Sequence, residues 1–244
     1  MAFMTVKFFS ECLGMQTEVY VLIPQGKAVS ENGYKCLYLL HGLSDDHTIW
    51  MRRTSIERYA DRYGICVVMP NVGRSWYTNT AYGARYYDFT AHELPARMRE
   101  FFRISDKRED NYVAGLSMGG YGALKIGLRE CESFACCAGL SSAADIASRT
   151  NREDIGSIFG GENAVPDDDD LFKLAEKYAH NGHKPRIYLG AGLEDSLYSE
   201  SVAIKEKLVS LGYDVTYRES HGGHTWEFWD EYIVYVLEWM LGKK

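Results

Sequence analysis

Hydrophobic and polar positions follow two different patterns along this chain, and together they predict alternating strands and helices. Residues 5–11 and 17–23 alternate apolar and polar side chains, which predicts two antiparallel edge strands. Apolar runs at 36–40 and 65–69 are nearly continuous, as expected for strands buried on both faces. Further strands are predicted at 112–114, 134–140, 186–190 and 215–218. Apolar residues at helical spacing predict helices at 49–63, 90–104, 120–128, 196–211 and 225–241.

This alternation predicts an α/β fold with a mainly parallel central sheet and helices on both faces. Residues 73–87 are rich in glycine and aromatic residues, and loops of that length are often functional. Residues 142–182 are polar, and we interpret them as a small cap inserted over the sheet edge. Their acidic run, Asp167 to Asp170, lacks the spacing of a calcium loop and is expected to start a helix near Leu171. Because no linker or repeat interrupts the chain, we predict one domain over residues 1–244 with a cap-like insertion at about 142–182.

Composition and charge restrict the partners. The formal net charge of −7 argues against nucleic acid or an anionic membrane surface. No apolar run approaches the roughly 18 residues needed to span a bilayer, and the first residues lack the layout of a signal peptide. The six cysteines form no C-x-x-C pair and are expected to be buried free thiols, with no disulfide or zinc framework. These features predict a cytoplasmic protein.

The candidate nucleophile is Ser117, in the motif Gly115-Leu116-Ser117-Met118-Gly119. The motif lies between a predicted strand and a predicted helix, which is the context that a G-x-S-x-G elbow requires. Ser117 would then occupy a strained turn, with glycines two residues to either side where a Cβ would collide with backbone. The motif alone also occurs by chance as a glycine-rich turn, so the rest of the chain has to support it.

A serine hydroxyl needs a base within hydrogen-bond reach and an acid that orients the base. In open α/β sheets these groups follow the carboxyl ends of strands. Asp195 follows the strand at 186–190, with Glu194 as its competitor and a helix N-cap as its alternative role. His221 and His224 both follow the strand at 215–218, and spacing favours His224. The order serine, acid, histidine is that of the α/β-hydrolase fold.

Ester chemistry also needs hydrogen-bond donors for the oxyanion. The backbone N–H groups of Met118 and Leu43 are the candidates, because each stands at a predicted strand end. His41, next to this second loop, could be mistaken for the base and is expected to be hydrogen-bonded within the loop.

Aromatic side chains of the 73–87 stretch are the candidate pocket lining. Trp76, Tyr77 and Tyr82 either line an apolar substrate pocket, with His41, or pack the protein interior.

Four runs of the chain carry a resemblance: Leu37-Tyr38-Leu39-Leu40-His41-Gly42, Trp76-Tyr77-Thr78 with Tyr82-Gly83, Glu93-Leu94-Pro95, and Ala114-Gly115-Leu116-Ser117-Met118-Gly119-Gly120-Tyr121-Gly122. In these runs the chain resembles the esterase D / tributyrin esterase family of α/β-hydrolases, which includes carboxylesterases, feruloyl esterases and S-formylglutathione hydrolases. The resemblance extends from about Val6 to Leu241.

The resemblance implies a catalytic triad of Ser117, Asp195 and His224, with the Leu43 and Met118 amides as oxyanion donors. The family's Gly-x-His-x-Trp pattern matches Gly222 to Trp226 and supports His224 over His221. Similar members often form homo-oligomers. Residues 142–182, which would shape the acyl pocket, match the family least.

We therefore predict a serine carboxylesterase that uses no metal or organic cofactor and acts on small-molecule esters with short acyl or aryl (feruloyl-type) groups. The alternatives are a thioesterase of the S-formylglutathione hydrolase type, an acyltransferase and, least favoured, a binding module with an inactive site.

Overall fold

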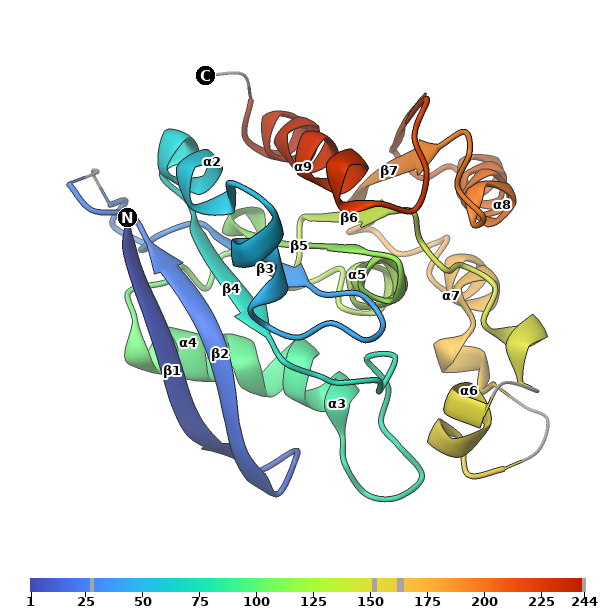
Figure 1. Cartoon of the computed structure of the whole chain (residues 1–244), viewed down its shortest axis with the longest axis horizontal. Helices are drawn as coiled ribbons and strands as arrows, with labels where there is room; N and C mark the ends of the chain where they lie inside the picture. Colours follow the sequence, from blue (N-terminus) through green and yellow to red (C-terminus); the bar gives the residue numbers. More distant parts are fainter. Residues whose placement is uncertain (27–28, 151–152, 162–164, 243–244) are drawn as a thin grey trace.

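The central sheet carries eight strands in the described part of the chain (Figure 1). The computed structural model describes residues 1–26, 29–150, 153–161 and 165–242. The strands are β1 (Ala2–Ser10), β2 (Met15–Ile23), β3 (Cys36–Leu40), β4 (Cys66–Pro70), β5 (Asn111–Leu116), β6 (Cys136–Leu140), β7 (Arg186–Gly192) and β8 (Val215–Ser220). Their order across the sheet is β1-β2-β4-β3-β5-β6-β7-β8. The β1–β2 and β2–β4 pairs are antiparallel and all later pairs are parallel, as the sequence predicts.

Helices cover both faces of this sheet (Figure 1). They are α1 (Ile49–Arg53), α2 (Ile56–Tyr63), α3 (Tyr86–Asp88), α4 (Leu94–Phe101), α5 (Met118–Arg129), α6 (Glu153–Ile158), α7 (Leu171–Lys177), α8 (Tyr198–Ser210) and α9 (Trp226–Leu241). Apolar residues of α1, α2 and α9 pack together in one cluster, on one side of the sheet. Those of α4, α5, α7 and α8 belong to a second cluster on the other side. The central strands are thus buried between two helical layers.

The parallel register brings the carboxyl ends of the central strands to one edge of the sheet. Leu40 pairs with Gly115, Leu116 with Leu140, and Leu140 with Gly190. Every residue of β3, β4, β5 and β6 is buried, which agrees with the continuous apolar runs in the sequence. Loops that follow these strands therefore emerge side by side.

Three predicted elements differ from the structure. The helix predicted at 49–63 is two helices, because Thr54 has extended backbone and its hydroxyl hydrogen-bonds to the Trp50 carbonyl, which ends α1. The helix predicted at 90–104 begins earlier, at α3, and continues through a π-helical turn (Phe89–Glu93) into α4, where Pro95 lies in the first turn. Of the two strands predicted to lie at the edge of the sheet, only β1 does so, since β2 pairs with β1 on one side and with β4 on the other.

The segment between β6 and β7 contains α6 and α7 and coincides with the insertion predicted at about 142–182, of which residues 151–152 and 162–164 lie outside the described residues. Asp170 caps α7 by accepting hydrogen bonds from two backbone amides, so the acidic run starts a helix as predicted. A buried Lys125 on α5 donates to Asp169 Oδ1 and to Thr78 Oγ1, each at 2.8 Å. The segment between β6 and β7 is therefore attached both to α5 and to the aromatic loop, which is the glycine- and aromatic-rich stretch at residues 73–87.

Candidate active site

Ser117 lies at the sharp turn between β5 and α5, in a backbone conformation that side chains rarely adopt. Its φ is 53° and its ψ is −118°, so the strained turn expected from the sequence is present. A Cβ on Gly119 would lie 2.5 Å from the Leu40 carbonyl oxygen, and one on Gly115 would collide with the Gly119 carbonyl. Only glycine at both positions lets the turn lie this close to β3.

His224 and Asp195 reach Ser117 from the loops after β8 and β7. The distance from His224 Nε2 to Ser117 Oγ is 3.0 Å, and His224 Nδ1 lies 3.0 and 3.1 Å from the two Asp195 carboxylate oxygens. A Cβ on Gly192 would collide with the Gly222 carbonyl, so these two loops are in close contact. The structure thus joins the three predicted residues in one chain of hydrogen bonds.

The environment of Asp195 fixes the direction of these bonds. Its side chain is inaccessible to solvent, whereas that of His224 is 33% exposed. Burial works to raise the pKa of the Asp195 carboxyl, but hydrogen bonds from His224, the Leu197 amide and the Ser141 hydroxyl outweigh it and hold the pKa below its usual value. An ionised carboxylate only accepts, so Nδ1 of His224 carries the proton and Nε2 is left to accept from the Ser117 hydroxyl.

The competing residues, Glu194 and His221, form a separate pair. His221 Nδ1 lies 2.8 Å from Glu194 Oε1, and the other carboxylate oxygen accepts from the Gly222 amide at 2.6 Å. His221 is 90% exposed. The structure therefore does not place this pair in the hydrogen-bond chain that includes Ser117.

The two amides predicted to bind an oxyanion flank Ser117. Met118 is the first residue of α5, so its N–H has no acceptor within that helix. A Cβ on Gly42 would lie 3.7 Å from the Ser117 Cβ, which places the His41-Gly42-Leu43 loop against Ser117. Among the described residues, the N–H groups of Leu43 and Met118 have no hydrogen-bond acceptor. Both are therefore free to donate.

His41 is buried and bound to backbone on both sides of its ring. Its Nε2 accepts from the Val72 amide at 3.1 Å, and its Nδ1 donates to the Gly42 carbonyl at 2.8 Å. Burial lowers its pKa to about 4, which keeps the ring neutral near pH 7. The prediction of a hydrogen-bonded loop residue is confirmed. Its ring links the loop after β3 to the loop after β4, and its predicted place in the substrate pocket stays a prediction.

The predicted pocket aromatics lie in two different environments. Trp76 and Tyr77 are buried with positive φ angles of 53° and 50°, and the Tyr77 hydroxyl donates to the His41 carbonyl at 2.9 Å. Tyr82 is 77% exposed and lines a pocket of about 240 Å³ between the aromatic loop and α6. Tyr77 thus holds the loop at residues 41–43 through a hydrogen bond, and the substrate role of all three aromatic residues stays a prediction.

Two residues next to the triad were not recognised in the sequence. Trp229, in the first turn of α9, packs its ring perpendicular to that of His224, with centroids 4.9 Å apart. Its indole N–H donates to Ser141 Oγ at 3.1 Å. Ser141 follows β6 directly, has a φ of 48° and is fully buried. The sequence feature that could have indicated Ser141 is its position at the carboxyl end of a central strand.

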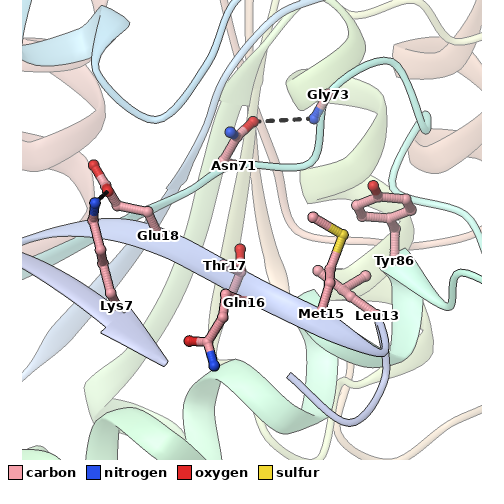
Figure 2. A pocket seen from close by; sticks show the side chains of 9 residues that line it. All are labelled: Lys7, Leu13, Met15, Gln16, Thr17, Glu18, Asn71, Gly73 and Tyr86. Carbon is pink, nitrogen blue, oxygen red and sulfur yellow. Dashed lines mark hydrogen bonds and ion pairs between the residues drawn. The ribbon is translucent and has the colours of Figure 1, made fainter. Parts of the chain in front are cut away.

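A larger pocket lies away from the triad. It has a volume of about 370 Å³ and is formed by the β1–β2 hairpin and the loop after β4 (Figure 2). Its charged and amide groups bind one another: Lys7 pairs with Glu18 at 2.9 Å, and Asn71 accepts from the Gly73 amide at 3.2 Å. Neither pair supplies a nucleophile with its base, so Ser117 remains the candidate.

Other residues with reactive or ligating side chains show no comparable arrangement. All six cysteines are free, and five of them are buried. Within the described ranges, no group of three or more His, Cys, Asp or Glu residues is placed to hold a metal ion. A search of the same residues finds no helix with the length and apolar character to cross a membrane.

Comparisons with known proteins agree over nearly the whole chain. A family model described as "Putative esterase" matches residues 10–240. The acetyl esterase of Caldicellulosiruptor saccharolyticus is 33% identical over 261 aligned positions, which cover 98% of each chain. The substrate-bound structure of FphF, a fluorophosphonate-binding serine hydrolase of Staphylococcus aureus, superposes with a TM-score of 0.92 at 32% identity and covers 99% of each chain. S-formylglutathione hydrolase FrmB from the same organism gives a TM-score of 0.89 at 32% identity, over 98% of each chain.

Proposed function

The chain belongs to this esterase family and has the α/β-hydrolase fold, and from this premise we propose that it hydrolyses short-chain or aryl carboxylic esters through an acyl-enzyme on Ser117. The observation that carries the proposal is the hydrogen-bond chain from Ser117 Oγ through His224 to the buried carboxylate of Asp195. The similarity to an acetyl esterase supports a small acyl group.

In the first half of the reaction, Ser117 Oγ attacks the ester carbonyl carbon while His224 Nε2 removes the hydroxyl proton. The carbonyl oxygen becomes an oxyanion, and the N–H groups of Leu43 and Met118 donate to it. His224 then gives its proton to the leaving alkoxide, the carbon–oxygen bond of the ester breaks, and the alcohol departs. Asp195 stabilises the imidazolium form of His224 during these steps.

In the second half, water repeats the attack on the acyl-enzyme. His224 accepts a proton from the water, and the resulting oxyanion is held by the same two amides. Collapse of this intermediate breaks the bond to Ser117 Oγ, which takes back the proton, and the carboxylic acid is released. The exposed third of the His224 ring gives water access to this base.

The test is hydrolysis of p-nitrophenyl butyrate by the wild-type protein and by Ser117→Ala, with detection of a phosphonate adduct by mass spectrometry. We expect turnover and a Ser117 adduct in the wild type only, with a loss of about 10⁴-fold or more in kcat for the variant. Equal activity of the two proteins would show that Ser117 is not the nucleophile.

A second candidate is a thioesterase, because the solved structure of an S-formylglutathione hydrolase is similar over nearly the whole chain. The same serine would attack a thioester carbonyl, and His224 would protonate the leaving thiolate. The ratio of kcat/KM for S-formylglutathione to that for p-nitrophenyl acetate separates the two functions. A ratio far above one would identify the thioester as the preferred substrate.

We extend the proposal to the setting of the enzyme: a single domain with a cap at about 142–182 that shapes the acyl pocket, acting in the cytoplasm as a homo-oligomer. The contacts of Lys125 with Asp169 and Thr78 support a cap held next to the site, and the free thiols support a reducing compartment. Light scattering of the purified protein tests the oligomer, since a monomeric mass would contradict it.

A further inference from the structure

We propose that Ser141 is a positioning residue that, with Trp229, holds the Asp195 carboxylate and the His224 ring in their working orientation. The inference rests on the proposed function, because it concerns the residues assigned there as acid and base. It adds two residues that do not touch the reacting atoms.

The directions of the hydrogen bonds follow from the chemistry of the groups. An indole N–H can only donate, so Ser141 Oγ accepts from Trp229 Nε1, at 3.1 Å. The hydroxyl proton of Ser141 is then available to the nearby Asp195 carboxylate, and the Ser141 side chain helps to lower the pKa of that carboxyl. The carboxylate, in turn, accepts from His224 Nδ1.

A contact between two aromatic rings, those of Trp229 and His224, completes the arrangement. The ring of Trp229 stands at 90° to that of His224, with centroids 4.9 Å apart. Trp229, Ser141, Asp195 and His224 therefore form a closed cycle of contacts. Rotation of any one side chain breaks a contact with both of its neighbours in the cycle.

The backbone around Ser141 is built to keep this hydroxyl in place. The Ser141 amide donates to the Gly190 carbonyl at 2.8 Å, which fixes the end of β6 against β7, the strand that leads to Asp195. Its φ of 48° is costly for a non-glycine residue, and such strain persists only where the surroundings impose it. Glycine would adopt this φ at a lower energetic cost but would lack the hydroxyl.

The neighbouring residue supplies a matched comparison. Ser142 is also buried, and within the described residues its Oγ has no hydrogen-bond partner. Loss of the Ser142 hydroxyl would remove a buried oxygen without touching the cycle. Loss of the Ser141 hydroxyl would leave the Trp229 N–H unpaired and would take one donor from Asp195.

The charged groups around Asp195 make the pH profile an informative readout. His224 is the titratable group hydrogen-bonded to Asp195, and the adjacent Glu194 is bound to His221 and the Gly222 amide. A carboxylate that has lost a donor attracts the proton of the imidazolium more strongly. The acidic limb of the kcat/KM profile should then move to higher pH, which a purely structural role would not cause.

The experiment compares wild type, Ser141→Ala and Ser142→Ala, with thermal unfolding as a check of folding. For Ser141→Ala we expect kcat to fall about tenfold, in the range found when an orienting hydrogen bond is removed. KM should stay nearly unchanged, and the acidic limb should move to higher pH. Ser142→Ala should keep the wild-type profile. If Ser141→Ala fails to fold, Ser141→Gly removes the hydroxyl and suits the positive φ.

A second variant tests the cycle itself. Trp229→Phe keeps an aromatic ring against His224 and removes the donor to Ser141, so a smaller shift in the same direction is expected. In the double variant with Ser141→Ala, the shift should not exceed that of Ser141→Ala alone, because the two residues act through one carboxylate.

Two results would overturn the inference: a wild-type pH profile in Ser141→Ala, or equal losses without a shift in Ser141→Ala and Ser142→Ala. If the wild type hydrolysed no ester, the proposed function would fail. The titration midpoint of the His224 ring, followed by NMR in wild type and Ser141→Ala, would still test the positioning role, with a move to higher pH expected.

Discussion

Two histidine–carboxylate pairs stand on the same two loops of this protein, and only one of them meets the serine. His221 and Glu194 are joined at 2.8 Å, and His224 and Asp195 at 3.0 Å. The first pair is exposed, with 90% of the His221 side chain and 57% of the Glu194 side chain accessible. The second has a fully buried acid and a base that is 33% exposed.

The comparison shows that a short histidine–carboxylate contact does not by itself make a base. The exposed pair has the shorter distance, but water can replace either partner, and its bond is screened by salt. The buried pair is held by further donors to Asp195 and by the perpendicular ring of Trp229. Only a fixed imidazole can present Nε2 to Ser117 in every encounter with substrate.

The largest difference between the pairs should appear when each histidine is removed. We expect His224→Ala to lower kcat by about 10⁴-fold or more, because nothing else takes the Ser117 proton. His221→Ala should stay within about twofold of wild type. Steady-state kinetics with p-nitrophenyl butyrate measure both, and near-normal activity of His224→Ala would reverse the assignment of the base.

Replacement of the two acidic residues should change kcat by nearly as different amounts as replacement of the two histidines. Asp195→Asn replaces an acceptor by an amide that can turn its N–H groups toward the ring, which favours the wrong tautomer of His224 and should cost about 10⁴-fold in kcat. Glu194→Gln keeps an acceptor for the Gly222 amide and should cost little. Comparable losses in the two variants would show that the loop as a whole, and not the buried carboxylate, supports the reaction.

The smallest effect is on stability in acid. Since the pKa of Asp195 lies below its usual value in the folded protein, its ionised form stabilises the fold above about pH 4, and this contribution is lost as pH falls through the folded pKa. The free energy of unfolding of wild type relative to Asp195→Asn should therefore fall between pH 6 and pH 3. Urea unfolding across this range measures it. The corresponding change for Glu194→Gln should vanish in high salt, and a salt-insensitive change there would contradict the comparison.

The sequence predicts the positions of the central strands well because most of them are mainly apolar runs followed by a polar loop. Those loops gave Ser117, Asp195 and His224 as candidates, with Glu194 and His221 as competitors, and the family resemblance favoured His224 over His221. That resemblance is confirmed by the comparisons. The break at Thr54 could not be predicted, since side-chain hydrogen bonds accompany it and one of them joins the Ser55 amide to Asp230, 175 positions away. Ser141 and Trp229 were missed because their contact joins positions 88 residues apart, which no local pattern indicates.

The position of His224 along the chain also bears on protein synthesis. All eight strands precede it, and the serine was made more than a hundred residues earlier, as the separation of 107 positions shows. Because chains emerge from the ribosome N-terminal end first, a growing chain can assemble the earlier strands and the turn at Ser117 while it still lacks the proposed base, His224. If His224 is the base, as we propose, the unfinished polypeptide hydrolyses no ester, and activity starts once the turn after β8 has folded against Ser117.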